Sequence, residues 1–192
     1  MKICVYGASS TEIDNRFIEE TEAFGRLLAE RGHGVVFGGG AQGLMGAVAR
    51  GVHEKGGELI GIAPTFFMNV DGVLYDECTK FIYTETMRER KQLMEDHSDA
   101  FVVTPGGIGT FEEFFEILTL KQLGRHTKPI VIYNIMGYFD SRNALLETAI
   151  EQKFMKDTCR ELYVFLDSPE AILEYLENYK GEEASTKYFK NI

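Results

Sequence analysis

The chain has few cysteines and histidines, and their spacing argues against a disulfide-linked protein and against a zinc protein. Of its 192 residues, only three are cysteine and none is tryptophan. Cys4, Cys78 and Cys159 are odd in number and far apart, so a disulfide framework is excluded and reduced thiols in a cytosolic protein are expected. The four histidines form no ligand pair at helical or hairpin spacing, so we expect no zinc site.

Positive charge and long apolar runs are also scarce. Thirty acidic residues against 20 basic ones give a formal net charge of −10. Such a chain repels nucleic-acid backbone, so polymer binding is not expected. No apolar run approaches the ~20 residues of a membrane span, and the start is too soon interrupted for a signal peptide. We therefore expect a cytoplasmic protein that does not enter a membrane.

What is present fits one globular domain. Hydrophobic residues make up 44% of the chain, and the length lies within the ~100–200 residues of typical single domains. We predict one nucleotide-binding domain over residues 1–180 and a polar tail over 181–192.

Short apolar runs alternate with amphipathic segments along the chain. This alternation predicts parallel strands joined by right-handed crossovers. The expected fold is α/β, a Rossmann-like, doubly wound three-layer sandwich around a mostly parallel sheet of about seven strands. The predicted strands are Lys2–Tyr6, Gly34–Phe37, Leu59–Ala63, Phe81–Thr84, Ala100–Thr104, Ile130–Tyr133 and Leu162–Leu166. The predicted helices are Asn15–Arg31, Leu44–Glu54, Thr86–His97, Thr110–Leu123, Phe139–Gln152 and a last one opening at Ser168, while Thr65–Thr79 is predicted to be a loop.

A first glycine cluster, residues 38–46 (GGGAQGLMG), follows the second predicted strand. Glycines there let the backbone approach a ligand, and the next helix offers free N–H groups to an anion. Gly38, Gly40 and Gly43 also fit G-x-G-x-x-G, with Glu58 at the spacing of a dinucleotide site. Close packing of helix against strand explains the same glycines without a ligand.

A second cluster, residues 105–113 (PGGIGTFEE), turns a predicted strand into a helix. This turn directs several N–H groups at one point, where a phosphate would lie. Thr110 and Glu113 have the spacing of a capping box, so Glu113 either caps the helix or acts chemically beside the phosphate. Glu112 has the place of a first-turn carboxylate favoured by the helix dipole.

A basic cluster, residues 86–91 (TMRERK), opens the predicted helix beside this loop. Thr86 and Glu89 have the spacing of another capping box. Arg88, Arg90 and Lys91 point in different directions around a helix, so they form either a solvated face or a site that one or two of them reach. An arginine near the second cluster would bind phosphate or ribose oxygens.

These three segments together resemble the LOG ("lonely guy") family. Residues 105–113 match its P-G-G-x-G-T-x-x-E signature, and residues 38–46 and 87–91 resemble its G-G-G-x-x-G-L-M-G and R-K segments. The resemblance runs from about Ile3 to Leu176. It implies a Rossmann-like homodimer that hydrolyses cytokinin riboside 5′-monophosphates, with no metal or cofactor and with a nucleoside monophosphate as its small-molecule partner.

The resemblance implies that Arg90 and Glu113 are catalytic. The glycine clusters and the resemblance together give the candidate substrate- and phosphate-binding residues: Ser9, Gly39, Gly40, Gly43, Met87, Lys91, Pro105, Gly106, Gly107, Ile108, Gly109, Thr110, Glu112 and Thr119. Plant members carry an acidic residue in the loop after the third strand, where this chain has residues 65–69 (TFFMN). That loop is expected to frame the base, so the choice between adenine and a modified adenine stays open.

The predicted reaction is hydrolysis of the N-glycosidic bond of a purine nucleoside 5′-monophosphate, AMP or a cytokinin riboside monophosphate. The alternative is a non-catalytic carrier or sensor of a nucleotide-like phosphate ligand, because a fold does not fix a function. A dehydrogenase rests on the G-x-G-x-x-G match alone. Lysine decarboxylation requires a lysine that binds pyridoxal, and the sequence offers no convincing one.

Overall fold

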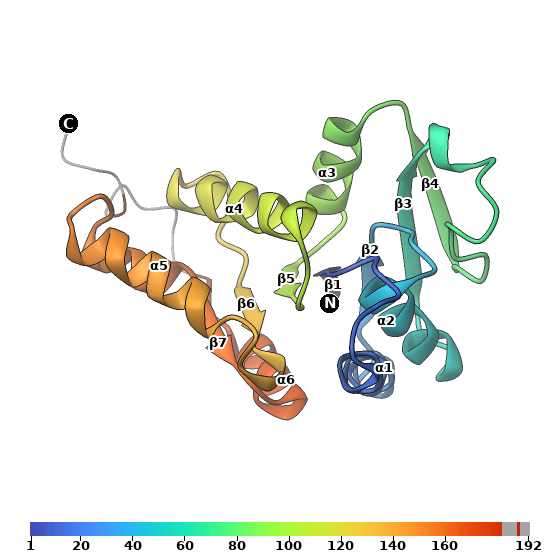
Figure 1. The fold of residues 1–192 in the computed structure, drawn as a ribbon, viewed down its shortest axis with the longest axis horizontal. Coiled ribbons are helices and arrows are strands. Elements are labelled where there is room, and N and C mark those ends of the chain that lie inside the picture. Colours follow the sequence, from blue (N-terminus) through green and yellow to red (C-terminus); the bar gives the residue numbers. More distant parts are fainter. Residues whose placement is uncertain (182–187, 189–192) are drawn as a thin grey trace.

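The structure, a computed structural model, describes residues 1–181 and Tyr188. Its seven strands are all parallel and follow the order β4-β3-β2-β1-β5-β6-β7 (Figure 1). The strands are β1 (Lys2–Tyr6), β2 (Gly34–Phe37), β3 (Leu59–Pro64), β4 (Lys80–Thr84), β5 (Ala100–Val103), β6 (Ile130–Tyr133) and β7 (Val164–Leu166). The predicted fold class is thereby confirmed. The predicted polar tail, 181–192, lies outside the described residues except for Gly181 and Tyr188.

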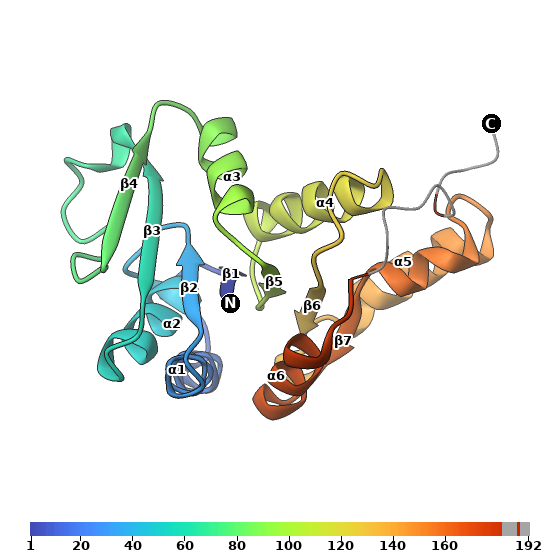
Figure 2. The same ribbon diagram turned by 180° about the vertical axis from the view of Figure 1, so that it is seen from behind.

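Helices cover both faces of this sheet. Figures 1 and 2 show α1, α2 and α6 on one face and α3, α4 and α5 on the other. They span α1 (Asn15–Glu30), α2 (Gly43–Glu54), α3 (Met87–Asp96), α4 (Ile108–Gln122), α5 (Asp140–Glu151) and α6 (Pro169–Asn178). No helix of the described part combines the length and apolar character needed to cross a membrane.

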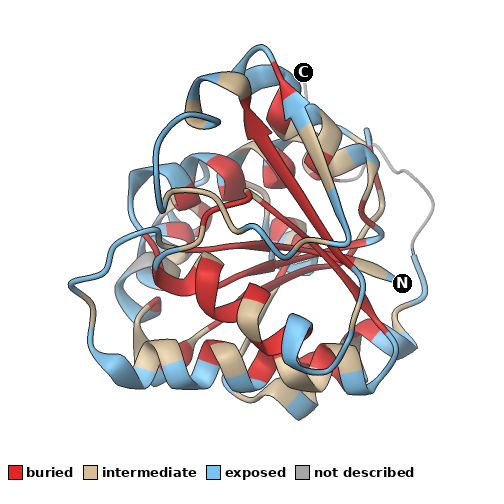
Figure 3. Ribbon diagram, turned by 90° about the vertical axis from the view of Figure 1, so that its right-hand side faces the viewer, coloured by how far each residue is buried: buried red, intermediate tan, exposed pale blue. Residues whose placement is uncertain are grey.

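The core consists of two apolar layers, one on each side of the sheet. Phe114 and Leu146 belong to the layer under α4 and α5, whereas Phe24 and Ile172 belong to the layer under α1 and α6. Figure 3 shows the central strands buried along their length. They read as continuous apolar runs because both of their faces are covered. Strand β4, at the sheet edge, is partly exposed.

Several helix ends follow their local sequence signals. Gly32, two residues after the end of α1, has the left-handed φ of +76° that ends many helices. The Ser168 hydroxyl accepts the Ala171 N–H at 3.3 Å, as predicted for the N-cap of α6. The Thr86 hydroxyl likewise accepts the Glu89 N–H at 3.1 Å. The Glu89 carboxylate, however, accepts the N–H of Glu85, so half of that capping box is confirmed.

The predicted start of α4 at Thr110 is wrong. The helix begins at Ile108, with Gly107 as an N-cap that makes no side-chain hydrogen bond. Thr110 therefore lies inside the first turn and cannot cap the helix. Its side chain instead packs where a Cβ on Gly106 would be. The capping-box explanation of Glu113 fails for the same reason.

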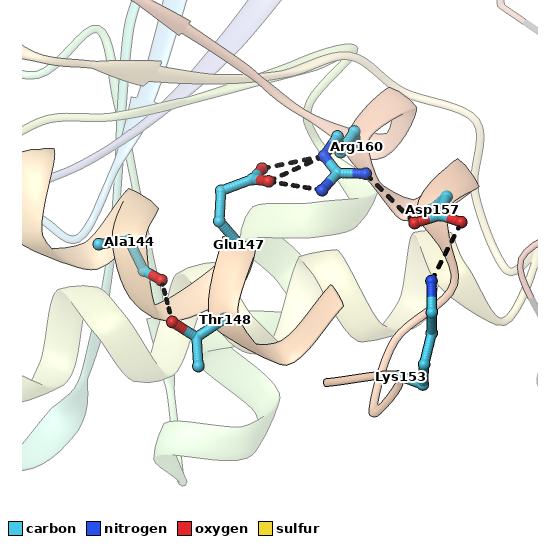
Figure 4. A network of polar contacts seen from close by, with 6 residues as sticks. All are labelled: Ala144, Glu147, Thr148, Lys153, Asp157 and Arg160. Atoms are coloured by element: carbon cyan, nitrogen blue, oxygen red, sulfur yellow. Dashed lines mark hydrogen bonds and ion pairs between the residues drawn. The ribbon is translucent and has the colours of Figure 1, made fainter. Parts of the chain in front are cut away.

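The segment before β7 also differs from the prediction. A strand was expected from Leu162, but residues Asp157–Leu162 form the 3-10 turn η3, and β7 begins at Val164. Burial of Cys159 and Leu162 holds this turn against the core. Arg160 fastens it to α5 through Nη2, 2.6 Å from Glu147 Oε2, and Nη1 reaches Asp157 (Figure 4). Two further 3-10 turns are η1 (Thr65–Phe67), inside the predicted loop, and η2 (Ile135–Gly137).

The strand order positions the candidate site. β1 and β5 are neighbours at the centre of the sheet. The loop after β1 leads to α1 on one face, and the loop after β5 leads to α4 on the other (Figure 1). Two loops that diverge at the carboxyl ends of parallel strands leave a crevice where ligands bind in such folds.

Candidate functional site

A cleft of about 610 Å³ opens at this point. Residues 7–10 after β1, residues 107–110 at the start of α4, and Gly38 and Gly40 after β2 line it. Met87 and Arg90 of α3 and Glu113 of α4 complete its polar end. The three segments that the sequence singled out therefore meet in one cleft.

The loop before α4 is held in a fixed course. The Ala8 N–H donates to the Pro105 carbonyl at 3.0 Å, which joins the loops after β1 and β5. The first N–H groups of α4 have no acceptor within the helix, because the first intrahelical bond runs from Phe111 N–H to the Gly107 carbonyl at 3.1 Å. These N–H groups and the positive end of the helix dipole suit an anion in the cleft.

The first glycine cluster supports the other side of the cleft. Gly43 has φ of +58°, and a Cβ on it would overlap the Ala8 carbonyl, so only glycine fits there. The Leu44 and Met45 N–H groups donate to that same carbonyl at 2.8 and 3.2 Å. Gly43 thus lets α2 pack closely against the loop after β1. The same close packing shapes one side of the cleft, so the two explanations of this cluster are compatible.

Arg90 and Glu113 form a buried ion pair at the polar end of the cleft. Arg90 Nη1 lies 2.7 Å from Glu113 Oε1, and the two side chains are 8% and 11% exposed. Arg90 Nε also donates to the Ile62 carbonyl of β3, at 3.1 Å. The Glu113 carboxylate and the Ile62 carbonyl therefore fix the orientation of the guanidinium plane. The cleft holds one buried cation and one buried carboxylate whose directions are set before a ligand binds.

The surroundings of Glu113 alter its acidity. Burial raises the pKa of the Glu113 carboxyl, and the charge of Arg90 opposes this rise. A carboxylate with few water contacts interacts more strongly with a nearby positive charge than an exposed one does. The pair can thus stabilise a cation that develops in the cleft and can direct a water molecule.

Room for the Arg90 side chain depends on Gly38. A Cβ at this position would overlap the guanidinium group. Gly38 directly follows β2, so the arginine from α3 passes over the end of that strand to reach Glu113. No local sequence pattern indicated this use of Gly38.

The predicted site residues divide into three groups in the structure. Those that line the cleft are Ser9, Gly40, Met87, Arg90, Gly107, Ile108, Gly109, Thr110 and Glu113. Gly39, Pro105 and Gly106 belong to the same loops and Gly43 opens α2, but none of the four lines the cleft. Lys91, Glu112 and Thr119 lie elsewhere on α3 and α4: Lys91 pairs with Glu112 and Glu116, and Thr119 is exposed.

The dinucleotide interpretation of the first cluster is wrong. Glu58, its expected ribose ligand, directly precedes β3 and pairs with Lys2 at 3.2 Å. Lys2 opens β1, so this pair lies at the amino edge of the sheet, opposite the cleft. Glu58 thus has the sequence spacing from Gly38 that a dinucleotide site requires, but it does not lie near the cleft.

The sequence indicated only part of the apolar wall of the cleft: Phe67 lies in the segment expected to frame the base, whereas Val73 and Leu74 were not expected there. Met45, Phe67, Val73 and Leu74 line it, and the last two come from the loop between η1 and β4. The Ala41 N–H donates to the Val73 carbonyl at 2.8 Å, which binds this loop to the first glycine cluster. No local pattern marks Val73 or Leu74, because a tertiary contact brings them to the cleft. The remaining lining residues, which were not among the candidate site residues, are Gly7, Ala8, Ser10, Gly38 and Gln42.

No group of three or more metal-ligating side chains occurs within the described part of the chain. The polar groups of the cleft are a guanidinium, a carboxylate, a threonine hydroxyl, serine hydroxyls, an amide and backbone N–H groups. This set suits a phosphorylated organic ligand.

Comparison with known sequences gives consistent relatives. Residues 45–176 match a sequence family described as "Possible lysine decarboxylase". The cytokinin riboside 5′-monophosphate phosphoribohydrolase LOG3 of Arabidopsis thaliana is 36% identical over 190 residues, covering 97% of this chain and 87% of the relative. LOG2 of the same plant is 34% identical over 178 residues, covering 93% and 83%.

Solved structures share the fold at lower identity. The X-ray structure of TM1055 has a TM-score of 0.72 and 23% identity, covering 93% of this chain and 99% of that one. The molybdenum cofactor carrier protein of Chlamydomonas reinhardtii has a TM-score of 0.70 and 20% identity, with 93% and 98% covered. At these identities the likeness concerns the fold alone.

Proposed function

Because the chain belongs to the LOG family, we propose that it hydrolyses the N-glycosidic bond of a purine nucleoside 5′-monophosphate to free base and ribose 5-phosphate. Both relatives described above are named phosphoribohydrolases of a nucleoside 5′-monophosphate. The chain covers more than four fifths of each of them. The preferred base, adenine or an N6-substituted adenine, is the open part of this proposal.

The 5′-phosphate binds at the start of α4 in this proposal. The N–H groups of Gly107, Gly109 and Thr110 donate to its oxygens, and the helix dipole adds to the attraction. Gly107 and Gly109 have no atom within 4 Å of an added Cβ, so their open side leaves space for a phosphate.

Glu113 and Arg90 carry the chemistry. As the glycosidic bond lengthens, the ribose becomes a cation like an oxocarbenium ion. The Glu113 carboxylate stabilises this cation or orients the attacking water, and Arg90 holds the substrate and balances charge. Water adds to C1′ and its second proton ends on the departing base, so the products are the neutral base and ribose 5-phosphate.

The base occupies the apolar wall. Met45, Phe67 and Leu74 offer hydrophobic contacts that suit a purine ring and an apolar N6 substituent. This wall carries no carboxylate among its described residues, in agreement with the TFFMN segment that replaces the acidic residue of plant members.

One observation carries this proposal: a buried Arg–Glu pair and an open helix N-terminus share one cleft. The experiment is to incubate the protein with AMP and an N6-substituted AMP and to separate free base by chromatography. A carrier would bind the nucleotide without releasing base, and its support is the fold shared with carriers at 20% identity. Lysine decarboxylation lacks support, because no lysine is among the residues that line the cleft.

A homodimer through α3 and α4 is part of the proposal. Phe115 of α4 is 42% exposed beside an apolar hollow that includes Phe111 and Leu145. Met87 of α3 is 44% exposed at the cleft. A second copy over these helices buries this surface and brings Lys91 and Thr119 near the partner, which accounts for their place outside this cleft. We further propose a cytosolic location, which suits three free cysteines.

A further inference from the structure

The loop that holds the proposed phosphate site has two successive carbonyls fixed by partners from outside the loop. The Pro105 carbonyl accepts the Ala8 N–H, as described above. The next carbonyl, that of Gly106, accepts the hydroxyl of Tyr138 at 2.7 Å. This second bond comes from a side chain, so a substitution can remove it and leave the backbone of the loop intact.

Tyr138 lies on a stiff turn between β6 and α5. Its ring packs edge-on against Phe17 of α1, with centroids 6.1 Å apart, and against Phe139 at 5.0 Å. The side chain of Asn134 spans the turn: its Oδ1 accepts the Phe139 N–H at 2.7 Å and its Nδ2 donates to Asp140 at 2.8 Å. The turn also holds Met136 at a φ of +51°, a conformation that surrounding contacts must maintain.

The bond to the Gly106 carbonyl sets the direction of the next N–H group. No peptide bond of the described chain is cis, so the Gly106 carbonyl and the Gly107 N–H point in opposite directions across one planar peptide. Gly107 lines the cleft, whereas Tyr138 is not among the residues lining it. Because the Tyr138 hydroxyl bonds the carbonyl side of this peptide, the Gly107 N–H points away from that hydroxyl.

We propose that Tyr138 is a positioning residue for the substrate phosphate: its hydroxyl holds the Gly106–Gly107 peptide so that the Gly107 N–H donates to that phosphate. The inference rests on the proposed function and deepens it. Glycines at 106, 107 and 109 leave this loop many conformations. A fixed peptide spares the substrate the entropy loss of ordering the loop on binding.

The test compares Tyr138→Phe with the wild type on AMP and adenosine. Phenylalanine keeps the ring contacts with Phe17 and Phe139 and removes the hydroxyl alone. Tyr163→Phe is the matched control, because the buried Tyr163 hydroxyl has no hydrogen-bond partner among the described residues and lies outside the cleft lining. The measurements are kcat/KM for both substrates and the affinity for ribose 5-phosphate by calorimetry.

We expect Tyr138→Phe to lower kcat/KM for AMP about tenfold, mainly through KM, the size of one hydrogen bond lost. The value for adenosine changes less than about twofold, since adenosine has no phosphate to lose contact with. Ribose 5-phosphate affinity falls with the AMP value, and Tyr163→Phe behaves like the wild type. Equal losses on AMP and adenosine, or no loss on AMP, overturn the proposal.

The role of Tyr138 can be tested independently of whether the protein is a hydrolase. If the wild type releases no base from AMP, the hydrolase proposal fails, and calorimetry with AMP and adenosine still decides the role of Tyr138. A selective loss of AMP affinity in Tyr138→Phe then supports the positioning role, and equal affinity of variant and wild type for AMP overturns it.

Discussion

Arg90 Nη1 lies 2.7 Å from Glu113 Oε1, although the two residues are 23 positions apart on separate helices. Strand β5 lies between them in sequence, and its carboxyl end places α4 beside α3. The pair is nearly buried and faces the cleft into which the N-terminus of α4 opens. The Glu113 carboxylate, proposed to act at the reacting carbon, therefore lies in the same cleft as the proposed phosphate site. The proposed hydrolysis depends on this arrangement.

Replacing Glu113 tests the proposed chemistry. Glu113→Gln keeps the size and a hydrogen-bond acceptor for Arg90 but removes the charge. We expect turnover of AMP to fall by ~10² or more, because a neutral amide stabilises a developing cation poorly. The free energy of unfolding should fall by no more than about 3 kcal/mol, since the buried Arg90 loses its counter-charge but keeps hydrogen bonds. Steady-state kinetics and urea unfolding measure both.

The matched control for this variant is Glu147→Gln. Glu147 also pairs with an arginine, Arg160, but on α5 and η3 outside the cleft (Figure 4). Its pair is partly exposed, so the change should alter stability by less than about 1 kcal/mol and leave turnover unchanged. Near wild-type turnover in Glu113→Gln would remove Glu113 from the mechanism.

Gly38→Ala tests the route of the Arg90 side chain. The added methyl group overlaps the guanidinium, so Arg90 must leave its place beside Glu113. We expect turnover to fall at least ~10-fold, because a displaced guanidinium no longer contacts the substrate. Gly34→Ala is the control: the atoms nearest to its methyl group belong to the flexible Glu58 side chain, at the amino edge of the sheet. Equal activities of the two variants would contradict the need for space at Gly38.

His126 predicts a dependence of stability on pH. Its Nε2 bonds the Ile117 carbonyl at 2.8 Å and its Nδ1 accepts the Lys128 N–H at 3.2 Å, so both nitrogens of the neutral ring are satisfied. Burial lowers the pKa of His126 from 6.5 to about 4. The unfolded chain then binds a proton more readily than the folded one between these values, so stability from this group is complete above pH 6.5 and is lost as the pH falls towards 4.

The corresponding measurement is urea unfolding between pH 4 and 7 for the wild type and His126→Gln. Glutamine can donate to the same carbonyl but does not titrate. The variant should show a smaller decrease in unfolding free energy over this range. Identical slopes would show that His126 is not the group responsible.

The proposed dimer predicts a mass twice that of the 21.7-kDa chain. Light scattering at micromolar concentration should give this mass, and Phe115→Glu should lower it, because a charge then lies in the buried interface. Phe154→Glu is the matched control, since Phe154 is 68% exposed and belongs to the segment after α5 and to neither α3 nor α4. A wild-type monomer would contradict the dimer.

The sequence predicted the elements of this fold well for a physical reason. Strands such as β2 and β6 are short, apolar and next to a glycine or proline, so they have the predicted bounds. The start of α4 was misplaced because Thr110 and Glu113 satisfy a capping pattern, while the true N-cap, Gly107, carries no side chain to signal it.

The site was predictable only where local sequence sets the backbone. The glycines at 107 and 109 marked the anion site, since without side chains they leave the N–H groups at the start of α4 open to a ligand. The Arg90–Glu113 contact, the space at Gly38 and the Tyr138 bond depend on strand order and packing. The sequence alone left Arg88, Arg90 and Lys91 as alternatives, and folding directs Arg90 to the cleft and Lys91 to Glu116.

The proposed hydrolysis of a nucleoside 5′-monophosphate is tested by comparing base release from adenosine, AMP, ADP and ATP under one condition. Two or three charge-assisted hydrogen bonds to the phosphate, each worth ~1.5–3 kcal/mol, predict that adenosine reacts at least ~10²-fold worse than AMP in kcat/KM. ADP and ATP should also react poorly, because the start of α4 receives one phosphate group. Equal rates for adenosine and AMP would contradict the phosphate site. No base release from AMP and N6-substituted AMP would contradict the proposed hydrolysis.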